Sequence, residues 1–167
     1  KDLSMRPNQI FLVSLDFSMI EKQMQKSIVA ELQKSLVTIF GLRTISPQDS
    51  RYKGTYLGNH HRDFAYHNGT VWPWLLGPFI KAYVKVHDHD PAQRQYAFHN
   101  FLQPMLDVYG DSWDGSIYEI FDGDPPYAPH GCITQAWSVA EILRTWVEDI
   151  ENITPRYESL VLNEVGV

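Results

Sequence analysis

The sequence predicts an all-α fold. Apolar residues recur at the spacing of one helix face in five separate stretches, whereas the apolar–polar alternation of a half-buried strand is scarce. The length of 167 residues fits a single domain that can bury one core. We expect residues 1–150 to form this domain and residues 151–167 to be a C-terminal tail.

The N-terminal part of the chain predicts a short helix followed by a long one. The short helix begins near Pro7, a residue that suits a first helical turn, and ends near Leu15. The long helix begins with the capping box of Ser18 and Glu21 and is expected to stop at Gly41. Its apolar stripe consists of Ile20, Met24, Ile28, Leu32 and Leu36.

Three further helices are expected downstream. The first follows Thr70 and is expected to kink at Pro78. The second begins at Asp90, whose carboxylate serves as the cap, and ends before Gly110. The third follows Thr134. Its predicted inward-facing residues are Ala136, Val139, Ala140, Leu143, Val147 and Ile150.

Two long connections separate these helices, over residues 41–69 and 110–133. Connections of this length are uncommon in compact domains and are usually functional or disordered. Both are rich in aromatic, Arg, His and Asp residues, unlike disordered segments. If successive helices alternate in direction, both connections lie at the same end of the helices, next to the start of the first helix. The sequence therefore predicts a site where two long loops meet on one rim.

Composition argues against several classes of partner. The net charge is −6 and no basic patch stands out, so we expect no nucleic-acid partner and no anionic membrane surface. There is no apolar run of about 18 residues and no signal peptide, so we expect no membrane span and a cytoplasmic protein. The single cysteine, Cys132, excludes an internal disulfide and a Cys-rich zinc site.

Motifs for metals and cofactors are not found in the sequence. The two histidine clusters, at 60–61 and 87–89, match no recognised zinc spacing, so we expect no metal. No nucleophile elbow, phosphate-binding loop or dinucleotide fingerprint is present, and no cofactor is expected.

The second long connection contains the candidate for acid–base chemistry. Glu119 lies between apolar residues, a setting that suits general acid or base catalysis. The alternative is a structural carboxylate that caps a turn or pairs with Arg43 or Arg62. Asp122 and Asp124, around a glycine and ahead of two prolines, are typical of a turn.

The end of the first long connection, residues 62–74, suits a sugar. Sugar hydroxyl groups need paired donors and acceptors, and the C–H face of a sugar needs an aromatic platform. The alternative is that Trp72 and Trp74 are core residues and that Arg62 and Asp63 form a local ion pair.

Four segments, together with residues 135–141, resemble the C-terminal part of glycogen debranching enzymes, the amylo-α-1,6-glucosidase domain. The segments are RPNQI at 6–10, GLRTISP at 41–47, YHNGTVWPW at 66–74 and EIFDGDPP at 119–126. The resemblance covers about residues 5 to 147, and it rests on the order and spacing of the segments.

This resemblance implies an (α/α)6 barrel, of which the five helices would form the closing part. It also implies inverting hydrolysis of the α-1,6-linked glucose at a glycogen branch point, with Glu119 as the general base. The general acid of the family lies upstream of these motifs and matches no residue here. The implied substrate contacts, by this resemblance and by analogy with related barrels, are Asn8, Gln9, Arg62, Asp63, His67, Trp72 and Trp137.

The same resemblance implies the partners. They are glycogen or another branched α-glucan, and either the N-terminal part of the barrel or a second copy of the chain, because a partial barrel exposes apolar helix faces. The chain begins at Lys1 without an initiator methionine, and we expect it to be part of a longer enzyme and inactive alone. The alternatives are a non-catalytic glucan-binding or regulatory module and a helical interaction domain without a sugar site.

Overall fold

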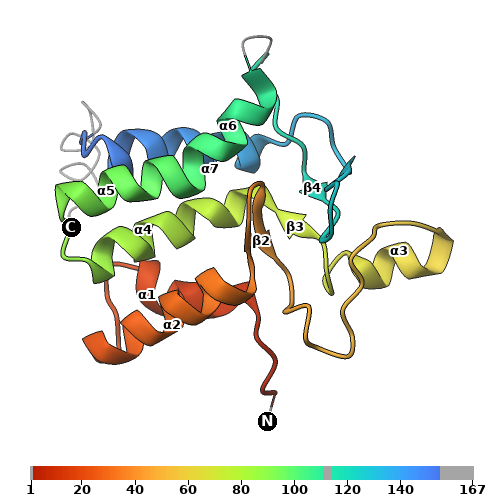
Figure 1. Cartoon of the computed structure of the whole chain (residues 1–167), viewed down its shortest axis with the longest axis horizontal. Coiled ribbons are helices and arrows are strands. Elements are labelled where there is room, and N and C mark those ends of the chain that lie inside the picture. Colours follow the sequence, from red (N-terminus) through yellow and green to blue (C-terminus); the bar gives the residue numbers. More distant parts are fainter. Residues whose placement is uncertain (1, 111–113, 155–167) are drawn as a thin grey trace, which may run out of the picture.

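The computed structural model describes residues 2–110 and 114–154 (Figure 1). Most of the expected C-terminal tail, 151–167, lies outside the described residues. In the described part of the chain, no helix has the length and apolar character needed to cross a membrane.

The structure mixes helices with a β-sheet, so the all-α prediction is wrong. Five short strands form one antiparallel sheet in the order β1-β2-β3-β4-β5. Three of them lie in the two connections that the sequence predicts as loops, and the other two lie where it predicts helix. The strands are β1 (Val37–Thr38), β2 (Gly41–Arg43), β3 (Val71–Trp72), β4 (Ile120–Phe121) and β5 (Pro129–His130).

The helices are arranged around α4 (Leu76–Val86), in which every residue except Lys81 and Lys85 is buried. In Figure 1 the N-terminal helices lie on one side of α4 and the C-terminal helices on the other. The first group is η1 (Pro7–Ile10), α1 (Phe11–Ser14) and α2 (Lys22–Ser35). The second is α5 (Pro91–Ala97), η3 (Phe98–Leu102), α6 (Gln103–Tyr109), α7 (Ala136–Arg144) and η5 (Thr145–Ile150).

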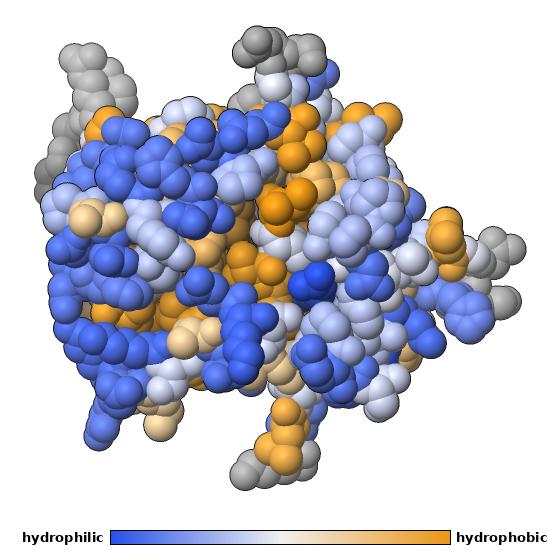
Figure 2. Space-filling model, viewed as in Figure 1, coloured by the Kyte–Doolittle hydropathy of each residue, from blue (hydrophilic) through white to orange (hydrophobic). Residues whose placement is uncertain are grey.

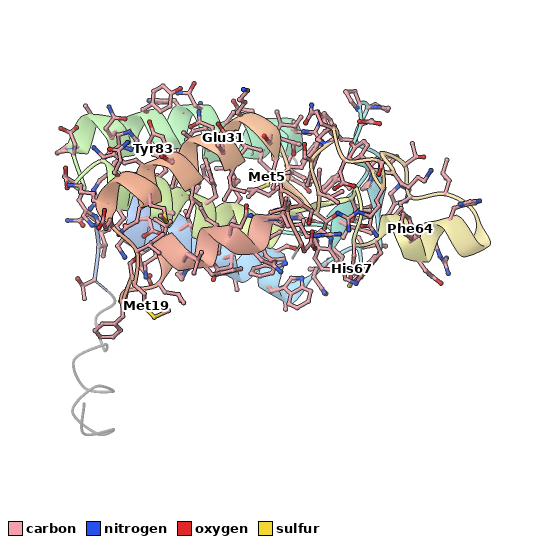
Figure 3. All side chains as sticks on the ribbon, turned by 90° about the horizontal axis from the view of Figure 1, so that it is seen from below. Met5, Met19, Glu31, Phe64, His67 and Tyr83 are labelled. Atoms are coloured by element: carbon pink, nitrogen blue, oxygen red, sulfur yellow. The ribbon has the colours of Figure 1, made fainter. Side chains whose placement is uncertain are left out.

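The sheet lies at one end of this helical body and joins the two long connections. Leu42 of β2 lies opposite Trp72 of β3, and Val71 of β3 lies opposite Phe121 of β4. The meeting of the two connections, which the sequence analysis expects, is thus achieved by strand pairing. The turn η2 (Pro73–Leu75) leads from β3 directly into α4. A short helix in the first connection, α3 (Asn59–Ala65), projects away from the body in both ribbon views (Figures 1 and 3).

Two predicted helix starts are replaced by other contacts. The hydroxyl group of Ser18 donates to the carbonyl oxygen of Leu12 at 2.8 Å, and α2 begins at Lys22 without a capping side chain. Thr70 does not cap a helix either, because its hydroxyl group donates to the carbonyl oxygen of Tyr66 at 2.8 Å. The position predicted to kink a helix, Pro78, lies in the first turn of α4, where a missing N–H group is tolerated.

The prediction for the fourth helix is confirmed at both ends. The carboxylate of Asp90 accepts from the backbone N–H groups of Ala92 and Gln93 at 2.7 and 3.1 Å. Gly110 follows the helix with a φ of 58°, in the left-handed region that favours glycine.

The last helix packs on α4 with a face that differs from the predicted one. Gly77 of α4 allows a close approach: a Cβ atom there would lie 2.3 Å from Oε2 of Glu141 and 2.8 Å from the hydroxyl oxygen of Thr145. The residues buried along α7 and η5 are Ser138, Ile142, Thr145 and Ile150. Of the predicted stripe, Ile150 is buried and Val139 is half-buried. The other four members are exposed, and we call them the α7 stripe: Ala136, Ala140, Leu143 and Val147.

Hydrophobic residues also reach the surface on the face seen in Figure 2, where they gather in the middle between hydrophilic margins. Ile39, in the turn between β1 and β2, is 40% exposed. Phe17 and Met19, between α1 and α2, are each more than nine-tenths exposed, and Figure 3 shows Met19 pointing away from the body. These three apolar side chains are therefore left uncovered by the rest of the described residues.

Candidate functional site

Two adjoining pockets lie at the sheet end of the helices and share His67. Figure 3 shows His67 in the loop region between the helical body and α3. The glutamate pocket, of about 430 Å³, is lined by Tyr56, Asp63, Tyr66, His67, Glu119 and Gly131. The tryptophan pocket, of about 300 Å³, is lined by residues that include Arg6, Asn8, His67, Trp72, Trp74 and Trp137.

The carboxylate of Glu119 is hydrogen-bonded at both oxygens. The hydroxyl group of Tyr66 donates to Oε1 in a short hydrogen bond, and the backbone N–H group of Cys132 donates to Oε2 at 3.0 Å. The backbone N–H group of Glu119 in turn donates to the carbonyl oxygen of Cys132 at 2.9 Å. These backbone contacts extend the pairing of β4 with β5, so the sheet sets the position of Glu119.

Gly131 closes one side of the carboxylate. Its φ is 73°, and a Cβ atom built on it would lie 2.5 Å from Oε2 of Glu119 and 2.9 Å from the Cβ atom of Glu119. A side chain at this position would push the carboxylate out of place, and the backbone conformation also favours glycine.

The two arginines considered as partners of Glu119 bind elsewhere. Arg43 Nε donates to the carbonyl oxygen of Gly123 at 2.8 Å, and Arg62 Nε lies 3.8 Å from Oδ1 of Asp63. Across the described residues, no lysine, arginine or histidine lies within ion-pair distance of Glu119. Its charge is therefore balanced by neutral hydrogen-bond donors.

Tyr66 is suited to this role as a donor. Burial raises the pKa of its hydroxyl group above the usual value of 10, and the hydrogen bond and negative charge of Glu119 raise it further. The phenol thus keeps its proton throughout the neutral range and remains a donor to the carboxylate.

Stacked and edge-on rings connect the two pockets. The ring of Tyr66 lies edge-on to His67 and Trp72, with centroids 4.9 and 4.8 Å away. His67 is nearly parallel to Trp72, with an angle of 9° between the rings. The ring of Trp72 is held in place by hydrogen bonds, because its indole nitrogen lies 3.2 Å from the carbonyl oxygen of Tyr66 and 3.1 Å from the hydroxyl oxygen of Thr70.

Trp137 provides the exposed aromatic surface of the tryptophan pocket. It is 45% exposed, whereas Trp72 is 7% exposed, and its ring lies 5.9 Å from those of Trp72 and Trp74. Arg6 also lines this pocket and anchors the N-terminal segment, since it donates to the carbonyl oxygen of His67 at 2.7 Å and to Oδ1 of Asn68 at 2.9 Å. The pocket combines an aromatic platform with polar groups, a combination that suits a sugar ring.

The two aspartates after Glu119 brace the loop, in line with their interpretation as turn residues. Asp122 is buried, and its Oδ1 accepts from the backbone N–H group of Tyr56 at 2.7 Å and lies 3.0 Å from Nε2 of His130. Asp124 accepts from the hydroxyl group of Tyr52 at 2.8 Å. Burial and this hydrogen bond raise the pKa of Tyr52 to about 12.

A family model described as amylo-alpha-1,6-glucosidase matches residues 1–144. The chain belongs to the amylo-alpha-1,6-glucosidase family. It is also similar to the glycogen debranching enzyme of Saccharomyces cerevisiae (strain ATCC 204508 / S288c), with 25% identity over 163 residues. The match covers 86% of this chain and 10% of the yeast enzyme, so the chain spans about a tenth of the length of this relative.

Most of the residues that the sequence predicts for an amylo-α-1,6-glucosidase site are brought together. Glu119 and Asp63 line the glutamate pocket, and His67 lines both pockets. The other residues placed at the tryptophan pocket are Asn8, Trp72 and Trp137.

Two of the predicted site residues, Gln9 and Arg62, line neither of the two pockets. Gln9 lines a separate apolar groove between η1 and α2, together with Leu12 and Met24. Arg62 lies on α3 with its guanidinium group 5.9 Å from the ring centroid of Tyr56, and it lines neither pocket.

Sequence reasoning missed several residues of the candidate site, above all Tyr66 and Gly131. Arg6 and Tyr66 lie inside the segments that carry the family resemblance, but that resemblance alone gives them no role. The contact between Tyr66 and Glu119 spans 53 residues, so no local pattern could reveal it. Within residues 2–110 and 114–154, no group of three or more His, Cys, Asp or Glu side chains could hold a metal ion.

Proposed function

We propose that this chain carries the general base of an inverting amylo-α-1,6-glucosidase that releases α-1,6-linked glucose from glycogen branch points. The observation that carries the proposal is the setting of Glu119. Its carboxylate lines an open pocket next to a tryptophan platform and is held by neutral donors instead of a cation. A carboxylate of this kind stays available to accept a proton.

The proposed reaction is a single displacement at the anomeric carbon. Glu119 takes a proton from a water molecule while the water oxygen bonds to that carbon. The bond from the carbon to the bridging oxygen breaks, and the bridging oxygen receives a proton from a general acid. Inverting enzymes place the two carboxyl groups about 6.5–9.5 Å apart to leave room for the water. We assign the acid to a segment upstream of this chain, and His67 and Asp63 to contacts with sugar hydroxyl groups.

The tryptophan pocket is the proposed platform for the glucan. Stacking of the C–H face of a glucose ring on Trp137 buries apolar surface, while Asn8 and His67 offer hydrogen bonds. Trp72 forms the floor of this pocket because it is itself buried and hydrogen-bonded.

We expect Trp137→Ala to weaken glucan binding by about 5- to 30-fold, because an exposed Trp at the centre of a contact contributes on the order of 1–2 kcal/mol. The affinity is measured by isothermal titration calorimetry, with a branched limit dextrin titrated into the purified chain. The matched control is Tyr96→Ala, since Tyr96 is an aromatic residue of α5 with nearly the same exposure, 43%, and lines neither pocket. Equal affinities in the two variants would contradict the assignment of the platform.

A second candidate function is a non-catalytic glucan-binding module. One observation favours it: side chains of this chain line the tryptophan pocket, so binding there need not require a further segment. Both functions predict that Glu119→Gln leaves glucan binding unchanged, and only a measurement of glucose release separates them.

We also propose that the α7 stripe is covered by a part of the longer enzyme that lies N-terminal to this chain. Two residues carry most of its apolar area, Leu143 at 52% and Val147 at 40% exposure. The stripe repeats at the spacing of one helix face, and the yeast relative is about ten times longer than the match. When that N-terminal part is absent, we expect a second copy of the chain to cover the α7 stripe instead.

The isolated chain is therefore expected to self-associate, since an uncovered apolar stripe is partly buried in that way. Light scattering at increasing concentration measures this, and Leu143→Glu is expected to shift the chain toward the monomer. A monodisperse monomer for the unchanged chain at all concentrations would contradict the proposed covered face.

A further inference from the structure

We propose that Tyr66 is the positioning residue of the base: its hydroxyl group, with the backbone N–H group of Cys132, fixes the orientation of the Glu119 carboxylate. The inference rests on the proposed role of Glu119 and adds a residue that acts on the reaction through it. Neither the family match nor the resemblance assigns a role to Tyr66.

The carboxylate of Glu119 is restrained from three directions. Tyr66 donates to Oε1, Cys132 donates to Oε2, and Gly131 lies against the side of the group. A carboxylate without such contacts turns about its terminal torsion, which is broad and nearly two-fold. Because each carboxylate oxygen of Glu119 accepts from one donor, the plane of the carboxylate is fixed. The lone pairs of Glu119 that are not hydrogen-bonded then keep a fixed direction relative to the glutamate pocket.

Tyr66 can act as a fixed reference because it is itself held tightly. Its carbonyl oxygen accepts from the hydroxyl group of Thr70 at 2.8 Å and from the indole of Trp72 at 3.2 Å. Its ring is packed edge-on against His67 and Trp72 and lies 5.9 Å from Tyr56. The hydroxyl group is thus carried by the same ring cluster that joins the two pockets, so the base and the sugar platform share one rigid support.

This arrangement predicts a loss of catalytic rate in Tyr66→Phe. This variant keeps the ring and its packing and removes only the hydroxyl group. A displacement of about 1 Å at a reacting group can lower a rate by about 10²-fold. We expect kcat to fall by about 10- to 100-fold, with KM and glucan affinity nearly unchanged.

The first test uses the chain alone and needs no activity. The ring-carbon signals of the labelled tyrosines are recorded by NMR at neutral pH, and the Tyr66 signal is assigned from its loss in Tyr66→Phe. Because the hydroxyl group of Tyr66 donates to a carboxylate oxygen of Glu119, Glu119→Gln replaces a charged partner by a neutral one and is expected to shift the Tyr66 signal.

The matched control is the second tyrosine–carboxylate pair of the chain, Tyr52 with Asp124. Asp124→Asn is expected to shift the Tyr52 signal, since Tyr52 donates to Asp124, and to leave the Tyr66 signal unchanged. If the Tyr66 signal does not respond to Glu119→Gln, the contact is absent in solution and the proposal is overturned.

The second test measures kcat and KM in a protein that joins this domain to the segment supplying the general acid. Tyr83→Phe is the control, because it removes a hydroxyl group that donates to Gln93 at 2.7 Å, away from both pockets. A normal kcat in Tyr66→Phe, in a protein that Glu119→Gln inactivates, would refute the positioning role and leave the base intact. Activity in Glu119→Gln would instead refute the proposed function itself.

Discussion

Glu119→Gln is expected to lower the rate of glucose release from a branched limit dextrin by about 10²–10⁴-fold, in a protein that joins this domain to the segment supplying the general acid. Glutamine has nearly the same shape as glutamate and can keep both contacts, because its amide oxygen can accept from the N–H group of Cys132 and its NH2 group can donate to the hydroxyl oxygen of Tyr66. It cannot take a proton from the attacking water. The loss therefore falls on kcat, while glucan affinity stays unchanged.

The control for this experiment is Asp124→Asn, in the same loop. Asp124 is an exposed carboxylate that binds Tyr52 and lines neither pocket, so its loss is expected to leave kcat close to that of the unchanged protein. Equal rates in the two variants would remove Glu119 from the reaction. A parallel loss of binding in Glu119→Gln would point to a contact with the ground-state substrate instead of a base.

Gly41→Ala is expected to destabilise the chain by about 2–4 kcal/mol. Gly41 has a φ of 138°, and a Cβ atom there would lie 2.3 Å from the carbonyl oxygen of Trp72 and 2.8 Å from the Cα atom of Pro73. Both neighbours are backbone atoms, which cannot move without separating β2 from β3. The free energy of unfolding is measured by urea denaturation of the isolated chain.

Gly58→Ala separates backbone strain from the clash. Gly58 also has a positive φ, 81°, but a Cβ atom there would meet no atom within 4 Å. Its loss of stability is expected to be about 1–2 kcal/mol, the cost of a positive-φ backbone conformation that favours glycine. A loss in Gly41→Ala no larger than this would show that β2 and β3 are not packed as closely as described.

The sequence predicted correctly those features of the fold that depend on neighbouring residues alone. The cap at Asp90 and the stop at Gly110 depend on residues within one helical turn, and both are as predicted. The sheet was missed because strands of two or three residues show no alternation, and because their pairing joins distant segments, such as Val71 with Phe121.

The outward face of α7 was missed for a related reason. The apolar spacing of the helix predicts that this face is buried, but the close approach to α4 at Gly77 places Ser138 and Thr145 inward instead. At the candidate site, the sequence pointed to Glu119, and the family resemblance added most of the other predicted residues that line the two pockets. It gave no role to Tyr66, whose contact exists only once the two long connections meet in the sheet.

The most direct test of the central claim is to locate glucan binding on the isolated chain by NMR titration with isomaltose or a branched limit dextrin. We predict that the shifts of the Cys132 amide, which contacts Glu119, and of the Trp137 indole change together, because the two pockets adjoin at His67. Signals at the hollow around Arg94 and Asn152, which is lined by other residues, are expected to stay unchanged. Shifts confined to that distal hollow, or none at saturating glucan, would contradict the account.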